Sequence, residues 1–385
     1  MPDSAATKTI LFAGGGTGGH IFPNLAVVER LREVQHETGP WEAHFVVSRR
    51  PLDRTVLEDA SVRFMPLAVR PLTSKPWCWP RWVSCWRRSV RDVQRLLRTE
   101  RVAAVVATGG FVSGPVVVAA VRLGVPVALV NLDAVPGKTN RALARRCESI
   151  FTVYPQTSWP EARSIGLPLR RSAVATADAA SSRKLNGLDP DRPTLLVLGG
   201  SQGATTLNLM IRPLLADTPK IRDLLTRWQV LHVAGRGEGV VESLERIYAE
   251  AAVPARVLSF CSQMGPAWGA ATLAISRAGA GSVAEAWANT VPTIFLPYPF
   301  HSDQHQKLNA EPLVRAGGAL ILEDRIEPSR NAQAAAAMLA PLLDGAAKRD
   351  TMRQTLGDSR PQDGAAAVAR WLQEKMDRPD AAICQ

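Results

Sequence analysis

The chain has 385 residues, of which 46% are hydrophobic and 21% charged. This composition excludes an intrinsically disordered protein, and the length suits two domains of roughly 150 to 200 residues each, with a cleft for a ligand. The formal net charge of +11 leaves nucleic acid, an anionic membrane and acidic substrates open as partners.

Membrane-spanning and secreted classes are not indicated. No apolar run approaches the roughly twenty residues that cross a bilayer, and residues 1–8 lack the pattern of a signal peptide. We therefore expect a cytoplasmic protein. The five cysteines contain no CxxC pair, which argues against a disulfide framework or a zinc site and predicts reduced thiols at Cys78, Cys85, Cys147, Cys261 and Cys384.

Strand-like apolar runs alternate with helical patterns along the chain, which predicts parallel, doubly wound α/β units. The runs are 9–13, 43–47, 102–107, 125–130, 195–198, 230–234, 273–276 and 293–297. A strand running into a glycine turn occurs at 9–20 and again at 194–204, which indicates two Rossmann-like domains facing a cleft. We expect an N-terminal domain at 1–170, a linker at 171–192, a C-terminal domain at 193–360, and a helix in 361–385 that packs back across the junction.

The first glycine turn, 14–20, fits the G-x-G-x-x-G pattern of dinucleotide sites. The acidic residue expected about twenty residues later is replaced by the segment 48–50 (Ser-Arg-Arg), which excludes an ordinary NAD site and leaves an NADP variant open. More generally, backbone amides at a helix start suit a phosphate or an oxyanion. His20 begins that helix, where it is a candidate general base or only a helix cap.

Two further glycine turns follow predicted strands, at 108–115 and 199–204. Ligand sites in such sheets lie beyond the carboxyl ends of the strands, so the three turns are expected at one crevice, although each glycine run also serves simply to turn the chain.

In the second half, the segment 276–285 runs from a strand into a helix of small residues. Its amides suit a diphosphate, and Glu285 lies one turn in, where it either accepts bonds from a ribose diol or complements the helix dipole. The segment 297–310 is dense in amides and imidazoles, which suit sugar hydroxyls: Asp303, Gln304, His305, Gln306 and Asn309. A formal DxD at 189–191 falls in the predicted linker, and we expect no metal there.

Residues 70–101 are basic and rich in tryptophan. Nine Lys and Arg residues outnumber two acids, a local excess of seven, and four of the ten tryptophans fall within 77–86. A stripe at 3-4-3-4 spacing predicts the buried face of an amphipathic helix: Val83, Trp86, Val90, Val93 and Leu97. The remaining tryptophans and nearby cations are candidates for membrane contact, with loop packing or base stacking as alternatives: Trp77, Trp79, Trp82, Arg81, Arg87 and Arg88.

These residues resemble the MurG family, the UDP-GlcNAc:lipid I N-acetylglucosaminyltransferases of peptidoglycan synthesis, which have the GT-B fold. The resemblance extends from about residue 8 to 345 and is carried by the motifs GGGTGGHIFPNLAV (14–27), ATGGFVSGP (107–115), GLPLR (166–170), GGSQGA (199–204), SRAGAGSVAE (276–285) and DQHQKLNA (303–310). It implies an inverting transfer, in which the 4-hydroxyl of MurNAc in lipid I (undecaprenyl-pyrophosphoryl-MurNAc-pentapeptide) attacks the anomeric carbon of GlcNAc and UDP departs, which makes lipid II.

The resemblance also implies the partners: UDP-GlcNAc, a lipid-linked acceptor and an anionic membrane surface on the cytoplasmic face of the inner membrane, with other cell-wall synthesis proteins as further candidates. It implies no metal or other cofactor, and nucleic acid becomes secondary. By motif, Glu285 holds the ribose, Arg170 and Ser201 the diphosphate, and His305 with Gln306 the GlcNAc hydroxyls. The backbone at 260–261 faces uracil.

The residues that the resemblance assigns to the sites are as follows. His20 is catalytic. The donor set is Thr17, Gly18, Gly19, Arg170, Ser201, Gln202, Cys261, Gly279, Ala280, Gly281, Ser282, Glu285, His305 and Gln306. The acceptor set is Gly15, Gly16, Gly109, Gly110, Ser113, Asp133 and Asn140.

One segment departs from the family pattern. Where the family has His-Glu-Gln-Asn, this chain has Val130-Asn131-Leu132-Asp133, ahead of the matching Gly-x-Thr-Asn at 137–140. A different acceptor, rearranged sugar contacts and reduced activity are all open. The alternative functions are a GT-B transferase with another lipid-linked acceptor, a non-catalytic nucleotide-sugar sensor or scaffold, and an NADP oxidoreductase.

Overall fold

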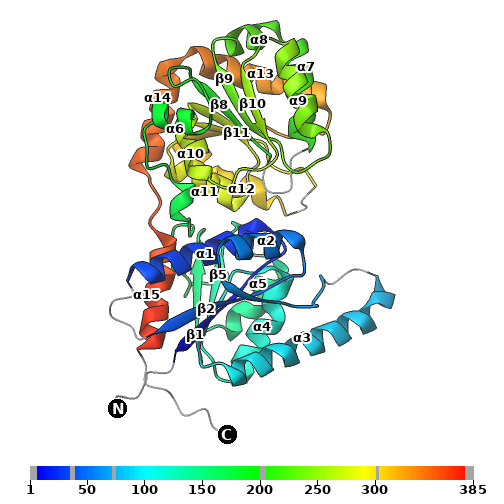
Figure 1. Ribbon diagram of the computed structural model, residues 1–385, viewed down its shortest axis with the longest axis vertical. Helices are drawn as coiled ribbons and strands as arrows, with labels where there is room; N and C mark the ends of the chain where they lie inside the picture. The colour runs from blue at the N-terminus through cyan, green and yellow to red at the C-terminus, as the bar shows by residue number, and fades with distance from the viewer. Residues whose placement is uncertain (1–6, 35–39, 72–74, 200–204, 301–302, 378–385) are drawn as a thin grey trace. The chain divides into compact units, whose positions relative to one another are not determined.

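The computed structural model describes residues 7–34, 40–71, 75–199, 205–300 and 303–377. The chain divides into two compact units, Met1–Arg170 with Gln362–Gln385, and Arg171–Pro361. Each unit is an α/β domain with its own parallel sheet (Figure 1).

The first unit contains β1 (Lys8–Ala13), α1 (Gly18–Glu33), β2 (Trp41–Val47), α2 (Pro51–Asp59), β3 (Arg63–Pro66), η1 (Pro76–Cys78), α3 (Trp79–Thr99), β4 (Val102–Ala107), α4 (Gly110–Arg122), β5 (Val127–Asn131), α5 (Lys138–Leu143), η2 (Ala144–Arg146), β6 (Ser149–Thr152), β7 (Arg163–Ser164) and α15 (Gly364–Met376). Among the described residues, the strand order is β3-β2-β1-β4-β5-β6-β7, and every neighbouring pair is parallel.

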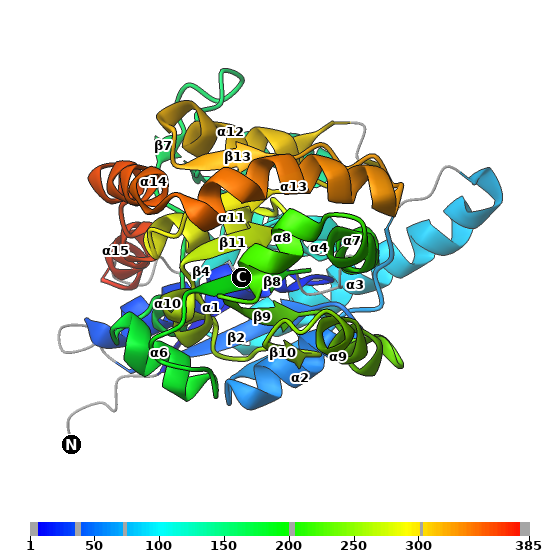
Figure 2. The ribbon, with the colours of Figure 1, turned by 90° about the horizontal axis from the view of Figure 1, so that it is seen from above.

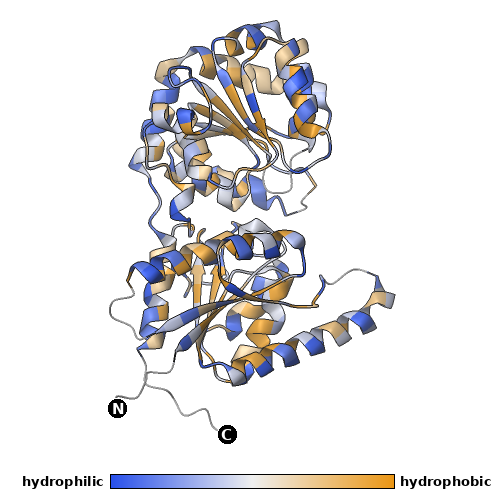
Figure 3. Cartoon of the chain, in the orientation of Figure 1, coloured by the Kyte–Doolittle hydropathy of each residue, from blue (hydrophilic) through white to orange (hydrophobic). Residues whose placement is uncertain are grey.

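Helices cover both faces of this sheet, which is why its central strands are continuously apolar rather than alternating. Leu11 of β1 and Val105 of β4 pack toward α3 and α4, whereas α1 and α15 lie together on the other face. Figure 3 shows the resulting pattern, with hydrophobic strands inside and the hydrophilic faces of the helices outside.

The second unit contains η3 (Arg171–Ala173), α6 (Ala179–Leu185), β8 (Thr194–Leu198), α7 (Thr205–Ala216), α8 (Pro219–Leu225), β9 (Gln229–Val233), α9 (Val240–Glu250), β10 (Ala255–Leu258), α10 (Met264–Ala270), β11 (Leu273–Ser276), α11 (Ala280–Ala288), β12 (Thr293–Phe295), α12 (His305–Ala316), β13 (Ala319–Ile321), α13 (Pro328–Asp344) and α14 (Ala346–Asp358). The described strands run in the order β10-β9-β8-β11-β12-β13, again all parallel. Figure 2, seen from above, shows α13 and α14 along the β13 side and α9 beyond β10.

In each sheet the strand order reverses beside the first strand, between β1 and β4 and between β8 and β11. Loops that follow such neighbouring strands leave in opposite directions, which opens a crevice at the carboxyl edge of the sheet. The predicted doubly wound fold, with two Rossmann-like domains, is therefore confirmed.

The segment 171–192 differs from the predicted linker because it is folded into the second unit. Asp178 caps α6 by accepting a 2.7 Å hydrogen bond from the Ser181 amide, and Arg183 donates to the carbonyl of Ala270 at the end of α10. The C-terminal helix α15 belongs to the first unit, where Asp363 pairs with Arg30 of α1 at 2.6 Å.

None of the helices in the described part of the chain combines the length and apolar character that crossing a bilayer requires.

Candidate functional site

The first unit brings His20 against the end of β4. The carbonyl of Thr108 lies 3.1 Å from His20 Nδ1, and the Thr108 hydroxyl donates to the His20 carbonyl at 2.7 Å. Asn24, one turn later in α1, donates to the same hydroxyl at 3.2 Å. The ring of His20 is thus held at the crevice between β1 and β4 by a residue 88 positions away in the chain.

The contact with Thr108 also decides the tautomer of His20. A carbonyl oxygen only accepts, so Nδ1 carries the proton and Nε2 of the neutral ring is left as an acceptor. Burial lowers the pKa of His20 below 6.5, while the carboxylate of Asp133, the Thr108 bond and Asp53 act in the opposite direction. The arrangement keeps the ring neutral near pH 7, which is the state a general base needs.

The second glycine turn packs directly against this ring. Gly110 has φ of +74°, and a Cβ there would lie 3.2 Å from the Gly15 carbonyl and 3.4 Å from the ring of His20. Only glycine fits both the backbone conformation and the space. The predicted turns at 14–19 and 109–114 therefore meet around His20.

Two residues of the predicted acceptor set support these loops instead of facing a ligand. Ser113 is fully buried, and its hydroxyl donates to the Gly109 carbonyl at 2.7 Å. Asn140 is buried, and its amide donates to Asn131 at 3.1 Å. The prediction that Ser113 contacts the acceptor is corrected, because its hydroxyl is used inside the turn.

The segment that departs from the family pattern is mostly internal. Val130, Asn131 and Leu132 are buried, and the side-chain amide of Asn131 donates to the Asp133 carbonyl at 2.8 Å. Asp133 is half-buried, and its charge acts on both His20 and Tyr154, whose pKa rises mainly through burial. Of the four positions that differ from the family pattern, Asp133 is the one whose side-chain charge acts on His20.

Gly16, another residue of the predicted acceptor set, has its backbone groups engaged within the protein. Its N–H donates to Asp53 Oδ2 at 2.8 Å, and its carbonyl accepts from Arg50. The prediction that Gly16 contacts the acceptor is therefore corrected, because its amide is used in a hydrogen bond within the protein. The sequence pattern did not single out Asp53, because the dinucleotide motif places its acidic residue at the end of β2. Asp53 lies instead in the first turn of α2.

The second unit places its site on α11. Gly279 caps this helix, and the first-turn residues Ala280, Gly281 and Ser282 are half-buried. A Cβ on Gly279 or Gly281 would meet no atom within 4 Å, so the space over the turn is open. Helix-start amides beside open space form an anion site of the kind that a diphosphate occupies.

Glu285 lies in the second turn of the same helix, is half-buried, and is bonded to a residue of α10. Trp268 of α10, fully buried, donates from Nε1 to Glu285 Oε2 at 2.8 Å. Burial raises the pKa of the Cys261 thiol, and the charge of Glu285 adds to that rise, so these two predicted donor residues are neighbours. The sequence offered no signal for Trp268, which lies 17 residues earlier on another helix.

A buried ion pair supports the start of this motif. Arg277 Nη1 lies 2.8 Å from Asp324 Oδ2, and the hydroxyl of Thr206 at the start of α7 donates to the same oxygen at 2.6 Å. Asn331 donates to Asp324 Oδ1 at 2.8 Å. The network joins α7, the end of β11 and the start of α13, all at the carboxyl edge of the sheet.

The polar segment before α12 is partly internal as well. Asn309 is fully buried and donates to the Ala278 carbonyl at 3.3 Å, which ties α12 to the turn before α11. Gln306 accepts from the Tyr298 amide at 2.9 Å, and His305 Nδ1 lies 2.8 Å from Asp303. These contacts use Oε1 of Gln306 and Nδ1 of His305. They therefore fix the direction in which the other end of each side chain points.

Other predicted donor residues fall elsewhere. Ser201 and Gln202 lie outside the described residues. Thr17 caps α1, with Gly18 and Gly19 in its first turn, and Arg170 stacks its guanidinium 4.4 Å from the ring centre of Phe22. These four belong to the first unit, whereas the α11 residues belong to the second.

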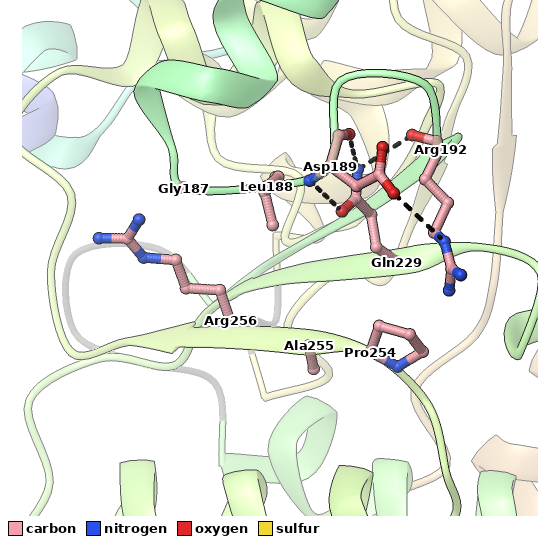
Figure 4. Close-up of a pocket in the computed structure, with 8 residues that line it drawn as sticks. All are labelled: Gly187, Leu188, Asp189, Arg192, Gln229, Pro254, Ala255 and Arg256. Carbon is pink, nitrogen blue, oxygen red and sulfur yellow. Dashed lines mark hydrogen bonds and ion pairs between the residues drawn. The ribbon is translucent and has the colours of Figure 1, made fainter.

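The second unit also has a hollow of about 330 Å³, lined by both polar and apolar residues, at the opposite, amino end of its strands (Figure 4). It lies beside Asp189, whose backbone is bonded to the buried Gln229 and whose carboxylate accepts from the Asp191 amide at 2.9 Å. None of the predicted site residues lines it. Among the described residues, no three His, Cys, Asp or Glu side chains gather closely enough to hold a metal.

The tryptophan-rich segment forms η1 and α3, whose amino-terminal end projects beyond α4 in both views (Figures 1 and 2). Trp77 is 75% and Trp79 50% exposed, whereas Trp82 is half-buried and donates to the Arg70 carbonyl at 3.0 Å. The predicted apolar stripe is confirmed at Val90, Val93 and Leu97.

The amino-terminal end of that stripe is corrected. Val83 is 37% exposed, because the first turns of α3 extend past the helix against which the rest of the stripe packs. Trp86 is half-buried against Gly114 of α4 and stacks on Trp82, with ring centres 5.2 Å apart. Arg81, Arg87 and Arg88 are exposed.

Comparisons with known proteins agree with this architecture. Residues 10–152 match the glycosyltransferase family 28 N-terminal domain, and residues 194–358 match the family 28 C-terminal domain. The chain is 33% identical over 367 residues, 93% of its length and 94% of the relative's, to the UDP-N-acetylglucosamine–N-acetylmuramyl-(pentapeptide) pyrophosphoryl-undecaprenol N-acetylglucosamine transferase of Clavibacter michiganensis subsp. michiganensis.

An enzyme of the same name from Nocardioides sp. is 35% identical over 319 residues, which cover 82% of this chain and 84% of the relative. Among solved structures, the crystal structure of Acinetobacter baumannii MurG is similar with a TM-score of 0.69 at 24% identity, covering 96% of this chain and 99% of that one.

Proposed function

This chain belongs to the family of UDP-N-acetylglucosamine–N-acetylmuramyl-(pentapeptide) pyrophosphoryl-undecaprenol N-acetylglucosamine transferases, and from that premise we propose how its own residues carry out the transfer. The protein is a glycosyltransferase. Its donor is UDP-GlcNAc, and its acceptor is the lipid-linked MurNAc-pentapeptide, whose 4-hydroxyl displaces UDP with inversion at the anomeric carbon.

His20 is the general base of this reaction. The bond from Nδ1 to the Thr108 carbonyl leaves Nε2 to take the proton from the acceptor hydroxyl as the new C–O bond forms. The 3.1 Å contact between Nδ1 and the Thr108 carbonyl is the single observation that carries the proposal, because a histidine that only capped the helix would not need Nε2 fixed as an acceptor. Gly15, Gly109, Gly110 and Asp133 surround the acceptor.

The second unit holds the donor. Glu285, whose carboxylate is oriented by the hydrogen bond from Trp268, accepts hydrogen bonds from the ribose diol. The amides of Gly279–Ser282 at the α11 start take the negative charge that develops on the leaving diphosphate. Arg170 and Ser201 stay predictions for the same group. His305 and Gln306 read the GlcNAc hydroxyls, and the backbone at Cys261 faces uracil.

We propose that the reaction needs no metal ion or other cofactor. The support is chemical: the amides at the α11 start supply positive charge to the leaving group without a cation.

The proposed location is the cytoplasmic face of the membrane, with Trp77 and Trp79 inserted at the lipid headgroups. Exposed indoles next to Lys75, Arg81, Arg87 and Arg88 match an interface that is apolar on one side and anionic on the other. Other cell-wall synthesis proteins are proposed partners because they would act at the same membrane face.

The test is incubation of the purified protein with UDP-GlcNAc and a lipid I analogue, followed by measurement of UDP and of the disaccharide product by mass spectrometry. Addition of EDTA tests the metal. We expect product that is unaffected by EDTA and lost in Glu285→Ala and His20→Ala.

Two outcomes would redirect the assignment. UDP-GlcNAc binding without transfer to lipid I would point to another lipid-linked acceptor, selected through Asp133. Binding without transfer to any of a panel of prenyl-linked acceptors would favour a nucleotide-sugar sensor.

A further inference from the structure

The first glycine loop is braced by residues that follow β2, outside every motif that carries the family resemblance. Asp53 is fully buried, and its Oδ2 accepts three hydrogen bonds, from the Gly16 amide at 2.8 Å, the Ser48 amide at 3.1 Å and the Ser48 hydroxyl at 2.6 Å. Gly15 permits this approach, because a Cβ there would lie 2.6 Å from the same oxygen.

Arg50 supports the same loop through the carbonyl of Gly16. Its Nη1 donates to the Gly16 carbonyl, and its own amide donates to the Ser48 hydroxyl at 3.2 Å. Gly16 has φ of +91°, a left-handed backbone conformation that glycine adopts readily and other residues rarely do. Asp53 therefore accepts from the N–H of Gly16, and Arg50 donates to its C=O.

The position of Gly16 governs the surroundings of His20. The Gly15 carbonyl packs against Gly110, and Gly110 packs against the ring of His20. A shift of the loop by a fraction of an ångström would therefore move both the acceptor-side amides and the base. Misplacement of reacting groups by about 1 Å is sufficient to slow a reaction roughly 100-fold.

We propose that Asp53 and Arg50 are positioning residues for the acceptor half of the reaction: they fix the first glycine loop through Gly16 and so set the geometry at His20. This inference rests on the proposed function. It assigns a specific role to the Ser-Arg-Arg segment, whose arginine braces protein backbone instead of meeting the 2′-phosphate of a dinucleotide.

The negative charge of Asp53 also affects the protonation of His20. The charged groups that bear on the loop and on His20 are Asp53 and Arg50 from α2 and its start, and Asp133 from the loop after β5, with Tyr154 beside Asp133. Removing the negative charge of Asp53 while keeping its shape should destabilise the protonated ring and move the titration of His20 to lower pH.

The test compares Asp53→Asn and Arg50→Met with a matched pair on the same helix. Arg54 and Glu58 form an exposed ion pair at 2.7 Å that touches neither the loop nor His20, so Arg54→Met and Glu58→Gln serve as controls. We expect the first two variants to raise the KM for the lipid acceptor about tenfold or more, the scale of a lost hydrogen bond to a charged group, with the KM for UDP-GlcNAc unchanged.

A substrate-free measurement separates this inference from the proposed function. The ring of His20, assigned by comparison with His20→Gln, is titrated by NMR in the wild type and in Asp53→Asn. Its midpoint should move to lower pH in Asp53→Asn and stay in place in Glu58→Gln.

The possible outcomes differ clearly. An inactive wild type with a shifted titration would contradict the proposed function and support the bracing. An unmoved titration together with equal losses for donor and acceptor would mean that Asp53 only stabilises the fold, and would overturn the inference. Urea unfolding of each variant, followed by circular dichroism, shows whether the first unit, which carries the substitutions, is folded.

Discussion

Trp268 Nε1 donates a 2.8 Å hydrogen bond to Glu285 Oε2, and this bond joins a fully buried indole to the carboxylate proposed to hold the donor ribose. The bond orients the Glu285 carboxylate from the buried side of α11. A glutamate that served only the helix dipole would not need a dedicated donor from another helix.

Trp268→Phe keeps most of the packing and removes the hydrogen bond. We expect the KM for UDP-GlcNAc to rise roughly five- to twentyfold, since a hydrogen bond to a charged group contributes about 1–2 kcal/mol, with little change in the KM for the acceptor. Trp228→Phe, at another buried indole of the same unit, is the control. Equal donor affinity in Trp268→Phe and wild type would refute this role.

His20→Ala should lower kcat at least about 100-fold, the usual scale of a general base. In the wild type, kcat/KM should rise with pH, because the base acts when neutral, and the midpoint should lie below 6.5, because burial lowers the pKa of His20 in the folded protein. A pH series of initial rates measures both. A midpoint above 6.5 would contradict the proposed environment of the ring.

Asp324→Ala leaves Arg277 buried without its carboxylate partner. Loss of one member of such a pair typically costs 3–5 kcal/mol, so the second unit should unfold at distinctly lower urea concentration. Asp303→Ala, at an exposed carboxylate of the same unit, is the comparison and should change stability by less than about 1 kcal/mol. Similar stability for the two variants would show that the network is not important for the fold.

Trp77→Ala and Trp79→Ala should each weaken binding to vesicles that contain anionic lipid, and the double variant should weaken it further. Arg87→Gln with Arg88→Gln should reduce binding about fivefold per charge, an effect that high salt removes. Leu209→Ala, exposed on α7 of the second unit, is the control. Co-sedimentation measures all of these, and unchanged binding in the tryptophan variants would remove η1 and α3 from the membrane contact.

The fold and the general position of the site were accessible from the sequence because they depend on local patterns. Apolar runs of strand length followed by glycine turns, as at 9–20 and 194–204, set the two parallel sheets, and parallel sheets bring the ends of their strands to one edge. His20, Gly110, Glu285 and His305 were selected as candidates in this way, each next to a turn that follows a strand.

The supporting contacts depended on tertiary structure because they join residues far apart in the chain. Thr108 selects the tautomer of His20 from 88 residues away, Asp53 braces Gly16 from 37 residues away, and Asp324 neutralises Arg277 from 47 residues away. No local spacing encodes such pairs. The sequence by itself determined the family, the two α/β units and the chemistry available at their strand ends. The tertiary structure decided which of those groups face a ligand and which, like Ser113 and Gly16, are used within the protein, because a hydrogen bond already made inside a buried loop is not available to a substrate.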